Sequence, residues 1–138
     1  MTAQEYLNQI KLYEEFIASN ERQIEKLNNE AIGLLGKDFG ERVQSSKSNN
    51  RLDSILMEIK ELITKIEIET EEYYTKKNEI WDVIKKVKNN EQRLVLRLRY
   101  IEGLKYKDIS EKMHRAERGI YNIHEKALEN VVVPESLQ

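Results

Sequence analysis

The chain has 138 residues, of which 35% are charged, with five Gly, one Pro and no Cys. The scarcity of turn residues disfavours a sheet-rich fold and favours long helices with charged faces, and the lack of Cys excludes disulfides, thiolate zinc sites and thiol catalysis. A net charge of −2 gives no overall attraction to nucleic acid or membranes. The chain shows neither a signal peptide nor a run of about 18 apolar residues, so we expect a cytoplasmic protein.

An apolar residue recurs every three or four positions along the N-terminal part of the chain. The series consists of Tyr6, Ile10, Tyr13, Ile17, Asn20, Ile24, Leu27, Ala31 and Leu34, and only Asn20 in it is polar. This spacing predicts one long helix over about residues 3–35 that carries a coiled-coil seam. A polar Asn in such a seam sets the register or the number of associating helices in other coiled coils.

Residues 36–50 interrupt the pattern and predict a loop, because Gly36 suits a helix end and Asn49 or Asn50 suits a helix N-cap. A second seam then follows, interrupted by Glu69 and Lys76, at Leu52, Ile55, Ile59, Leu62, Ile66, Tyr73, Ile80, Val83 and Val87. Two matched seams joined by a loop predict a long antiparallel hairpin over residues 1–88, closed within one chain or swapped between chains. Neither helix buries its seam alone, so we expect a homo-oligomer.

Residues 89–130 predict three short helices, over about residues 91–101, 105–113 and 116–128, followed by a tail at 131–138 that packs or frays. Helices this short, joined by tight turns, suit a compact unit better than a coiled coil. The last two match a helix-turn-helix, in which Ile109 and Met113 pack against Ile120 and Ile123. The expected fold is therefore all-α, with a hairpin followed by a three-helix helix-turn-helix unit.

The second helix of this motif presents a polar outer face of the kind that enters a DNA major groove, where Arg reads guanine and Asn reads adenine. The base-reading candidates are Glu117, Arg118, Tyr121 and Asn122. Between residues 93 and 118 eight basic side chains face four acidic ones, and the candidates for phosphate contacts are Arg99, Lys105, Lys107, Arg115 and Lys126. So modest an excess predicts salt-sensitive binding that is weak for a monomer and stronger for an oligomer.

No other pattern indicates chemistry. His114 and His124 have no metal-ligand spacing around them, so we expect no metal site and place His114 in a turn and His124 on a helix surface. Ser45 and Ser46 have no acid or base arranged near them in the sequence, and the glycines lack the Lys-Ser/Thr of a phosphate loop. We expect no catalytic residue and no cofactor, and hence no enzyme.

Residues 91–113 read EQRLVLRLRYIEGLKYKDISEKM. This segment resembles the start of the fourth conserved region of primary sigma factors, where a Val-Leu-Arg-Leu-Arg-Tyr helix precedes a Gly and a scaffold helix. Over about residues 1–130 the chain is similar to small phage proteins with a coiled-coil N-terminal half, an Arg-Val-Gln-Ser-Ser element (here Arg42–Ser46) and a sigma-like C-terminus. Those proteins are grouped with late-gene transcriptional regulators of the RinA and ArpU kind.

The resemblance implies a phage-encoded transcriptional regulator that binds double-stranded DNA in the bacterial host cell. The chain departs from the family pattern at the turn, where His114 replaces Gly and Ala116 replaces an N-cap Ser. His114 must therefore adopt or avoid a left-handed conformation.

Two other classes of function stay open. Ala116, Glu117 and the near-neutral charge of residues 91–138 favour a coiled-coil adaptor that binds RNA polymerase or another regulatory protein with little or no DNA contact. A purely structural coiled coil would keep its function without residues 91–138. Steep loss of DNA affinity with rising salt separates the regulator from the adaptor.

Overall fold

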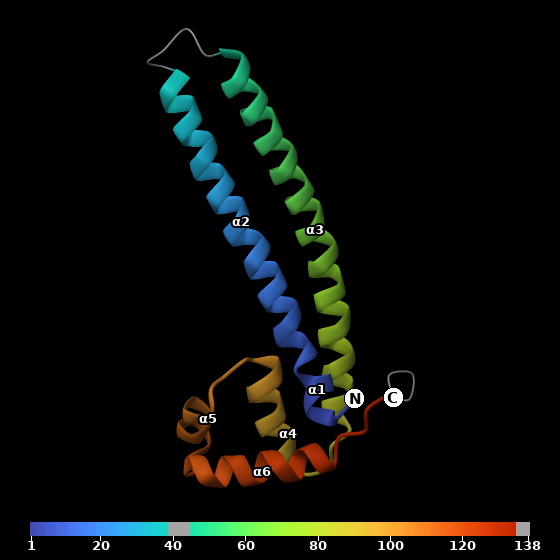
Figure 1. The fold of residues 1–138 in the computed structure, drawn as a ribbon. Coiled ribbons are helices and arrows are strands. Elements are labelled where there is room, and N and C mark those ends of the chain that lie inside the picture. Colours follow the sequence, from blue (N-terminus) through green and yellow to red (C-terminus); the bar gives the residue numbers. More distant parts are fainter. Residues whose placement is uncertain (39–44, 135–138) are drawn as a thin grey trace. The chain divides into compact units, whose positions relative to one another are not determined.

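The computed structural model describes residues 1–38 and 45–134 (Figure 1). They form α1 (Ala3–Leu7), α2 (Gln9–Asp38), α3 (Ser45–Lys85), α4 (Asn90–Leu96), a π-helical segment η1 (Arg97–Ile101), α5 (Tyr106–Met113) and α6 (Glu117–Glu129). No strand occurs among these residues, and the predicted all-α class is confirmed.

The helix bounds differ from the prediction near both ends of the first helix. The helix predicted over residues 3–35 is divided at Asn8 and extends to Asp38. Its start is fixed by a capping box, in which the Thr2 hydroxyl accepts from Glu5 N at 3.1 Å and the Glu5 carboxylate accepts from Thr2 N at 3.2 Å. Helix α3 begins at Ser45, inside the predicted loop 36–50. Residues 42–44 of the Arg-Val-Gln-Ser-Ser element lie outside the described residues.

Packing divides the chain into two compact units, which we call the terminal unit (Met1–Tyr13 with Glu72–Gln138) and the hairpin unit (Glu14–Glu71). The division therefore falls within α2 and α3 and not at residue 88, where the sequence predicts the boundary. The reason is that both chain ends contribute to one core in the terminal unit. Charge follows the same division: the hairpin unit has a net charge of −5 and the terminal unit +3.

In the hairpin unit, α2 and α3 lie side by side and antiparallel around the predicted seam (Figure 1). Its core consists of Leu27, Ala31 and Ile55, with Leu34, Leu52, Ile59 and Leu62 packed against them. The Asn20 amide donates to the Glu69 carboxylate at 2.9 Å, so the polar interruptions of the two seams meet each other. A partly buried polar pair of this kind favours one register over its neighbours, because a shift would leave both groups without a partner.

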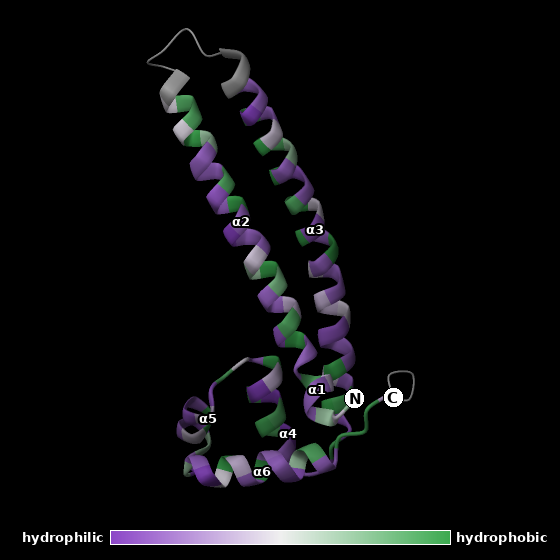
Figure 2. Cartoon of the chain, in the orientation of Figure 1, coloured by the Kyte–Doolittle hydropathy of each residue, from purple (hydrophilic) through white to green (hydrophobic). Residues whose placement is uncertain are grey.

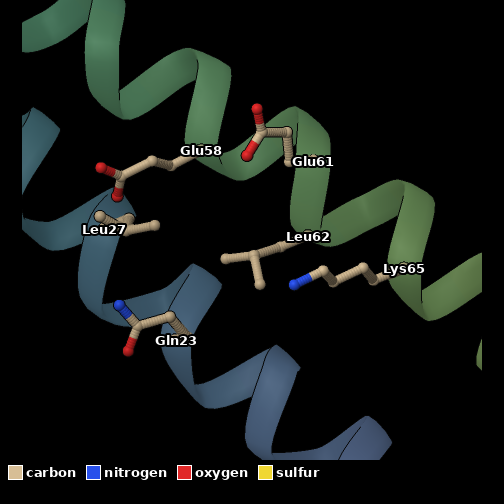
Figure 3. A pocket seen from close by; sticks show the side chains of 6 residues that line it. All are labelled: Gln23, Leu27, Glu58, Glu61, Leu62 and Lys65. Carbon is tan, nitrogen blue, oxygen red and sulfur yellow. The ribbon is translucent and has the colours of Figure 1, made fainter.

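An open groove of the hairpin unit lies between α2 and α3, lined by Gln23, Leu27, Glu58, Glu61, Leu62 and Lys65 (Figure 3). Leu62 points from α3 toward α2, while charged side chains surround it. The groove is thus a shallow, open gap along one side of the two-helix seam.

One side of the hairpin unit exposes apolar side chains, which we call the apolar flank: Ile32, Leu35, Leu56 and Ile63, with exposed fractions of 66%, 46%, 54% and 46%. Each residue directly follows a seam position, and in an antiparallel pair the positions after the seam on both helices face the same side. Figure 2 shows apolar and polar residues alternating along both helices. Two helices alone therefore leave a strip of Leu and Ile in water.

The main core of the terminal unit joins five parts of the chain. Its buried residues are Tyr6, Leu7, Ile10, Ile80, Val83, Ile84, Val87, Leu96, Tyr100, Ala127, Val131 and Val133. The start of the chain, the last turns of α3, the α4–η1 helix and the end of α6 thus pack together. The described part of the tail packs, through Val131 and Val133.

Lys76, the second interruption of the α3 seam, is also paired. Its ammonium lies 3.0 Å from the Glu79 carboxylate, which accepts a hydrogen bond from the Tyr6 hydroxyl at 2.9 Å. Burial alone would raise the pKa of Glu79, but the bonds from Lys76 and Tyr6 outweigh it and lower that pKa. Burial and the same carboxylate raise the pKa of Tyr6. Both polar interruptions of the α3 seam therefore have partners.

Candidate nucleic-acid interface

Helices α5 and α6 form a helix-turn-helix that closes over a second, smaller core of the terminal unit. Its buried residues are Val95, Leu98, Ile109 and Ile120, with Leu104, Tyr106, Met113 and Ile123 packed against them. The packing of Ile109 and Met113 against Ile120 and Ile123, predicted from spacing, is present. One face of α6 is thereby held against α4, η1 and α5.

The turn between α5 and α6 passes through His114, which has φ 54° and ψ 44°. His114 therefore adopts the left-handed conformation that glycine enters most easily. Arg115 N donates to the Ser110 carbonyl at 3.1 Å, and the Ser110 hydroxyl donates to the Arg115 carbonyl. Ala116 precedes α6 without a side-chain cap. Hydrogen bonds from α5 thus close the turn although His114 and Ala116 stand where the regulators that the sequence resembles have a Gly and a Ser.

The base-reading candidates Glu117, Arg118, Tyr121 and Asn122 are all exposed. The opposite face of α6 carries the buried residues Ile120, His124 and Ala127. Arg118 and Asn122 stand one helical turn apart and so lie one above the other on the outer face. Within the described part of the chain, neither side chain has a hydrogen bond or an ion pair, so their donors are available to a ligand.

The phosphate-contact candidates fall into two groups. Lys105, Lys107 and Lys126 are exposed and form no ion pair with any described residue. Lys105 and Lys107 stand at the start of α5, and Lys126 stands in the last turn of α6. These three lysines are therefore free to meet phosphates.

The two arginines of the set are already engaged. The Arg115 guanidinium is bonded to the Glu91 carboxylate. Arg99 is half-buried, donates to the Leu104 carbonyl at 3.0 Å, and lies over the Tyr106 ring with its guanidinium carbon 4.3 Å from the ring centroid. Arg99 thus holds the end of η1 and the start of α5 together, and its charge is only partly accessible.

His124 is buried, and the prediction that it lies on a helix surface is wrong. It is 4% exposed, and its Nε2 lies 2.7 Å from the hydroxyl of Tyr100, which is 7% exposed. Burial lowers the pKa of His124, and the charge of Arg99 lowers it further, so the ring is neutral near pH 7. The sequence holds a signal for this position, because His124 follows buried Ile120 by four residues and so shares its face of α6.

Aromatic rings connect this buried pair to the outer face of α6. The rings of Tyr100 and His124 stack with centroids 5.6 Å apart, and Tyr106 meets His124 edge-on at 5.6 Å. Tyr106 in turn contacts Tyr121, with centroids 4.3 Å apart. We call Tyr100, His124, Tyr106 and Tyr121 the aromatic chain. Sequence spacing did not reveal it, because its members come from three separate helices.

Among the described residues, no three His, Asp or Glu side chains converge as metal ligands do. None of the helices in that part of the chain is long and apolar enough to cross a membrane.

Comparison with curated proteins and with solved structures found no match. A family model matches residues 35–131, which is more than two thirds of the chain and includes all of α3, α4, α5 and α6. The chain therefore belongs to the family described as "Protein of unknown function (DUF1492)".

Proposed function

We propose that the chain is a phage-encoded transcriptional regulator, without enzymatic activity, that binds double-stranded DNA in the cytoplasm of the bacterial host. The observation that carries the proposal is the outer face of α6, where Arg118, Tyr121 and Asn122 are exposed while the inner face is held by packing. Such a helix fits the major groove. The phage and transcription parts of the proposal rest on the likeness to sigma region four and to RinA and ArpU regulators.

The distribution of charge supports DNA binding by the terminal unit. This unit has a net charge of +3, against −5 for the hairpin unit. Lys105, Lys107 and Lys126 are free to hold the phosphate backbone while α6 reads base edges. Glu117 repels phosphate, so in this arrangement it faces a base edge, where its carboxylate accepts from a cytosine amino group.

We further propose that chains associate through the apolar flank of the hairpin unit. Among the described residues of this unit, the buried core of its two-helix seam consists of Leu27, Ala31 and Ile55. Burying a Leu or Ile completely is worth about 1.5–3 kcal/mol, so covering four half-exposed ones with a second copy yields a substantial driving force. An oligomer also multiplies the phosphate contacts, which compensates for the small charge excess of one terminal unit.

Fluorescence anisotropy with a labelled phage-promoter duplex over a salt series tests DNA binding. Affinity should fall steeply with salt, and Lys107→Ala should weaken all sequences alike and reduce the slope of log K against log[salt] by about one. Arg118→Ala combined with Asn122→Ala should remove site preference. Lys65→Ala is the matched control, since Lys65 is an exposed lysine of the hairpin unit and should bind like wild type.

The competing function is an adaptor that binds RNA polymerase or another regulatory protein. One observation favours it: α6 itself carries three acidic side chains against two basic ones. No shift of the duplex at low salt, together with co-purification of RNA polymerase, would refute DNA binding in favour of the adaptor.

A further inference from the structure

We propose that Tyr121 reads thymine methyl groups in the major groove and that Tyr106 is the positioning residue that holds the Tyr121 ring. The inference rests on the proposed function, because it names the base that one side chain of the DNA-binding face recognises.

Tyr121 is exposed, yet one side of its ring packs against another aromatic ring. It is 47% exposed on the outer face of α6, and its ring centroid lies 4.3 Å from that of Tyr106, with 35° between the ring planes. Tyr106 comes from the first turn of α5, the other helix of the helix-turn-helix. The contact therefore covers part of the Tyr121 ring and leaves the remainder open to a ligand.

Tyr106 is itself held by two groups that are anchored inside the unit. The Arg99 guanidinium carbon lies 4.3 Å from the Tyr106 centroid, and the same side chain is bonded to the Leu104 carbonyl at 3.0 Å. The buried His124 ring meets Tyr106 edge-on. The aromatic chain thus connects Tyr121 to the core through side chains that have little freedom.

The position of Tyr121 on α6 places it among the groups that face base edges. It follows Arg118 by three residues and so lies beside it on α6, and Arg118, Tyr121 and Asn122 are all exposed. Base edges in the major groove present hydrogen-bond donors, acceptors and one apolar group, the C5-methyl of thymine. A tyrosine side chain has only two rotatable bonds, and one that already packs against a neighbouring ring loses little entropy on contact. The apolar part of the Tyr121 ring therefore matches the thymine methyl, as Arg118 matches guanine and Asn122 adenine.

A purely structural role for the Tyr106–Tyr121 pair makes a different prediction. If the pair only stabilises the helix-turn-helix, removal of either ring lowers stability but affects all duplexes equally. A purely structural role would not make the affinity for a duplex depend on the presence of one methyl group.

The experiment compares two duplexes that differ only in this methyl group, with the full-length chain. One is the tightest duplex recovered from a randomised pool, and the other is its copy with every thymidine replaced by deoxyuridine. Wild type should bind the deoxyuridine copy about fourfold more weakly for each contacted methyl, from the transfer free energy of a group of that size. Tyr121→Ala should bind both duplexes alike, and Tyr121→Phe should keep the preference, because the ring and not the hydroxyl makes the contact.

Variants of Tyr106 test its positioning role. Tyr106→Leu should reduce the preference for thymine while circular dichroism shows that the helices remain folded, and Tyr106→Phe should restore it. Tyr74→Ala is the matched control, because Tyr74 is a 57% exposed tyrosine on α3 of the terminal unit and should leave the preference unchanged.

Equal binding of both duplexes by wild type would overturn the inference and leave DNA binding intact. Full thymine preference in Tyr106→Leu would overturn the positioning role. The absence of duplex binding at low salt would refute this inference and the proposed function together.

Discussion

Tyr100→Phe tests whether the buried Tyr100–His124 pair stabilises the terminal unit. The hydroxyl of Tyr100 is the hydrogen-bond partner of the His124 ring, at 2.7 Å, and both side chains are almost fully buried. The substitution keeps the ring and leaves the imidazole nitrogen without a partner in a place that water does not reach. Such a group costs about 1–3 kcal/mol of the free energy of unfolding. In a unit of about 60–100 residues, each kcal/mol lowers the melting temperature by about 4–8 °C.

Urea denaturation followed by circular dichroism measures the free energy of unfolding. Tyr74→Phe is the control, because its hydroxyl is on an exposed side chain and the change should stay within about 0.5 kcal/mol. A second variant, Tyr100→Phe with His124→Phe, should recover part of the loss, since no polar atom then stays unpaired. Wild-type stability of the single variant Tyr100→Phe would refute a stabilising role for this hydrogen bond.

Three further outcomes are expected. The pKa of His124 in the folded chain is lowered from its ordinary value of 6.5, so the unfolded chain binds the proton first as the pH falls. The free energy of unfolding should therefore be full above about pH 6.5 and decrease below it. Urea titrations at several pH values measure this dependence. The variant without Tyr100 and His124 should lack this decrease. Asn20→Ala should lower the stability of the hairpin unit by about 1 kcal/mol and speed its amide hydrogen exchange, because Glu69 loses its partner. Leu56→Lys should reduce the mass measured by light scattering to that of a monomer. Met57→Lys, on a different face of α3, should leave the mass unchanged. An unchanged mass in Leu56→Lys would exclude the apolar flank as the interface.

Heptad spacing is sufficient to predict the helices of the hairpin unit. The apolar residues recur at short, regular intervals, and each of them lies on the same face of its helix. The polar interruptions at Asn20 and Glu69 were visible in the sequence as well. Their pairing was not, because it depends on the register between two helices that are joined by a loop. Spacing within one helix carries no information about that register.

The core of the terminal unit could not be predicted in the same way. It joins Tyr6 and Ile10 to Ile84, Tyr100 and Val131, which are far apart in the chain. Periodicity identifies a buried face but not the face that it meets, so the predicted boundary at residue 88 cuts through this core.

The candidate interface was predictable in part. The exposed positions of α6 follow from its apolar stripe, and Arg118, Tyr121 and Asn122 were found in this way. The engagement of Arg99 and Arg115 was not, because a count of charges treats every cation as accessible. The polar residue type of His124 indicates a surface position, whereas its spacing of four residues from Ile120 indicates the buried face, and the spacing agrees with the structure.

The opposite net charges of the two units bear on the approach to a polyanion. The field of a phosphate backbone attracts the terminal unit and repels the hairpin unit, and so exerts a torque on the chain whatever angle the units make. Encounters are thereby biased toward those in which the terminal unit arrives first. The bias weakens as the Debye length shrinks to about 8 Å at physiological ionic strength, so under the proposed function salt should slow the association with DNA as well as weaken the complex.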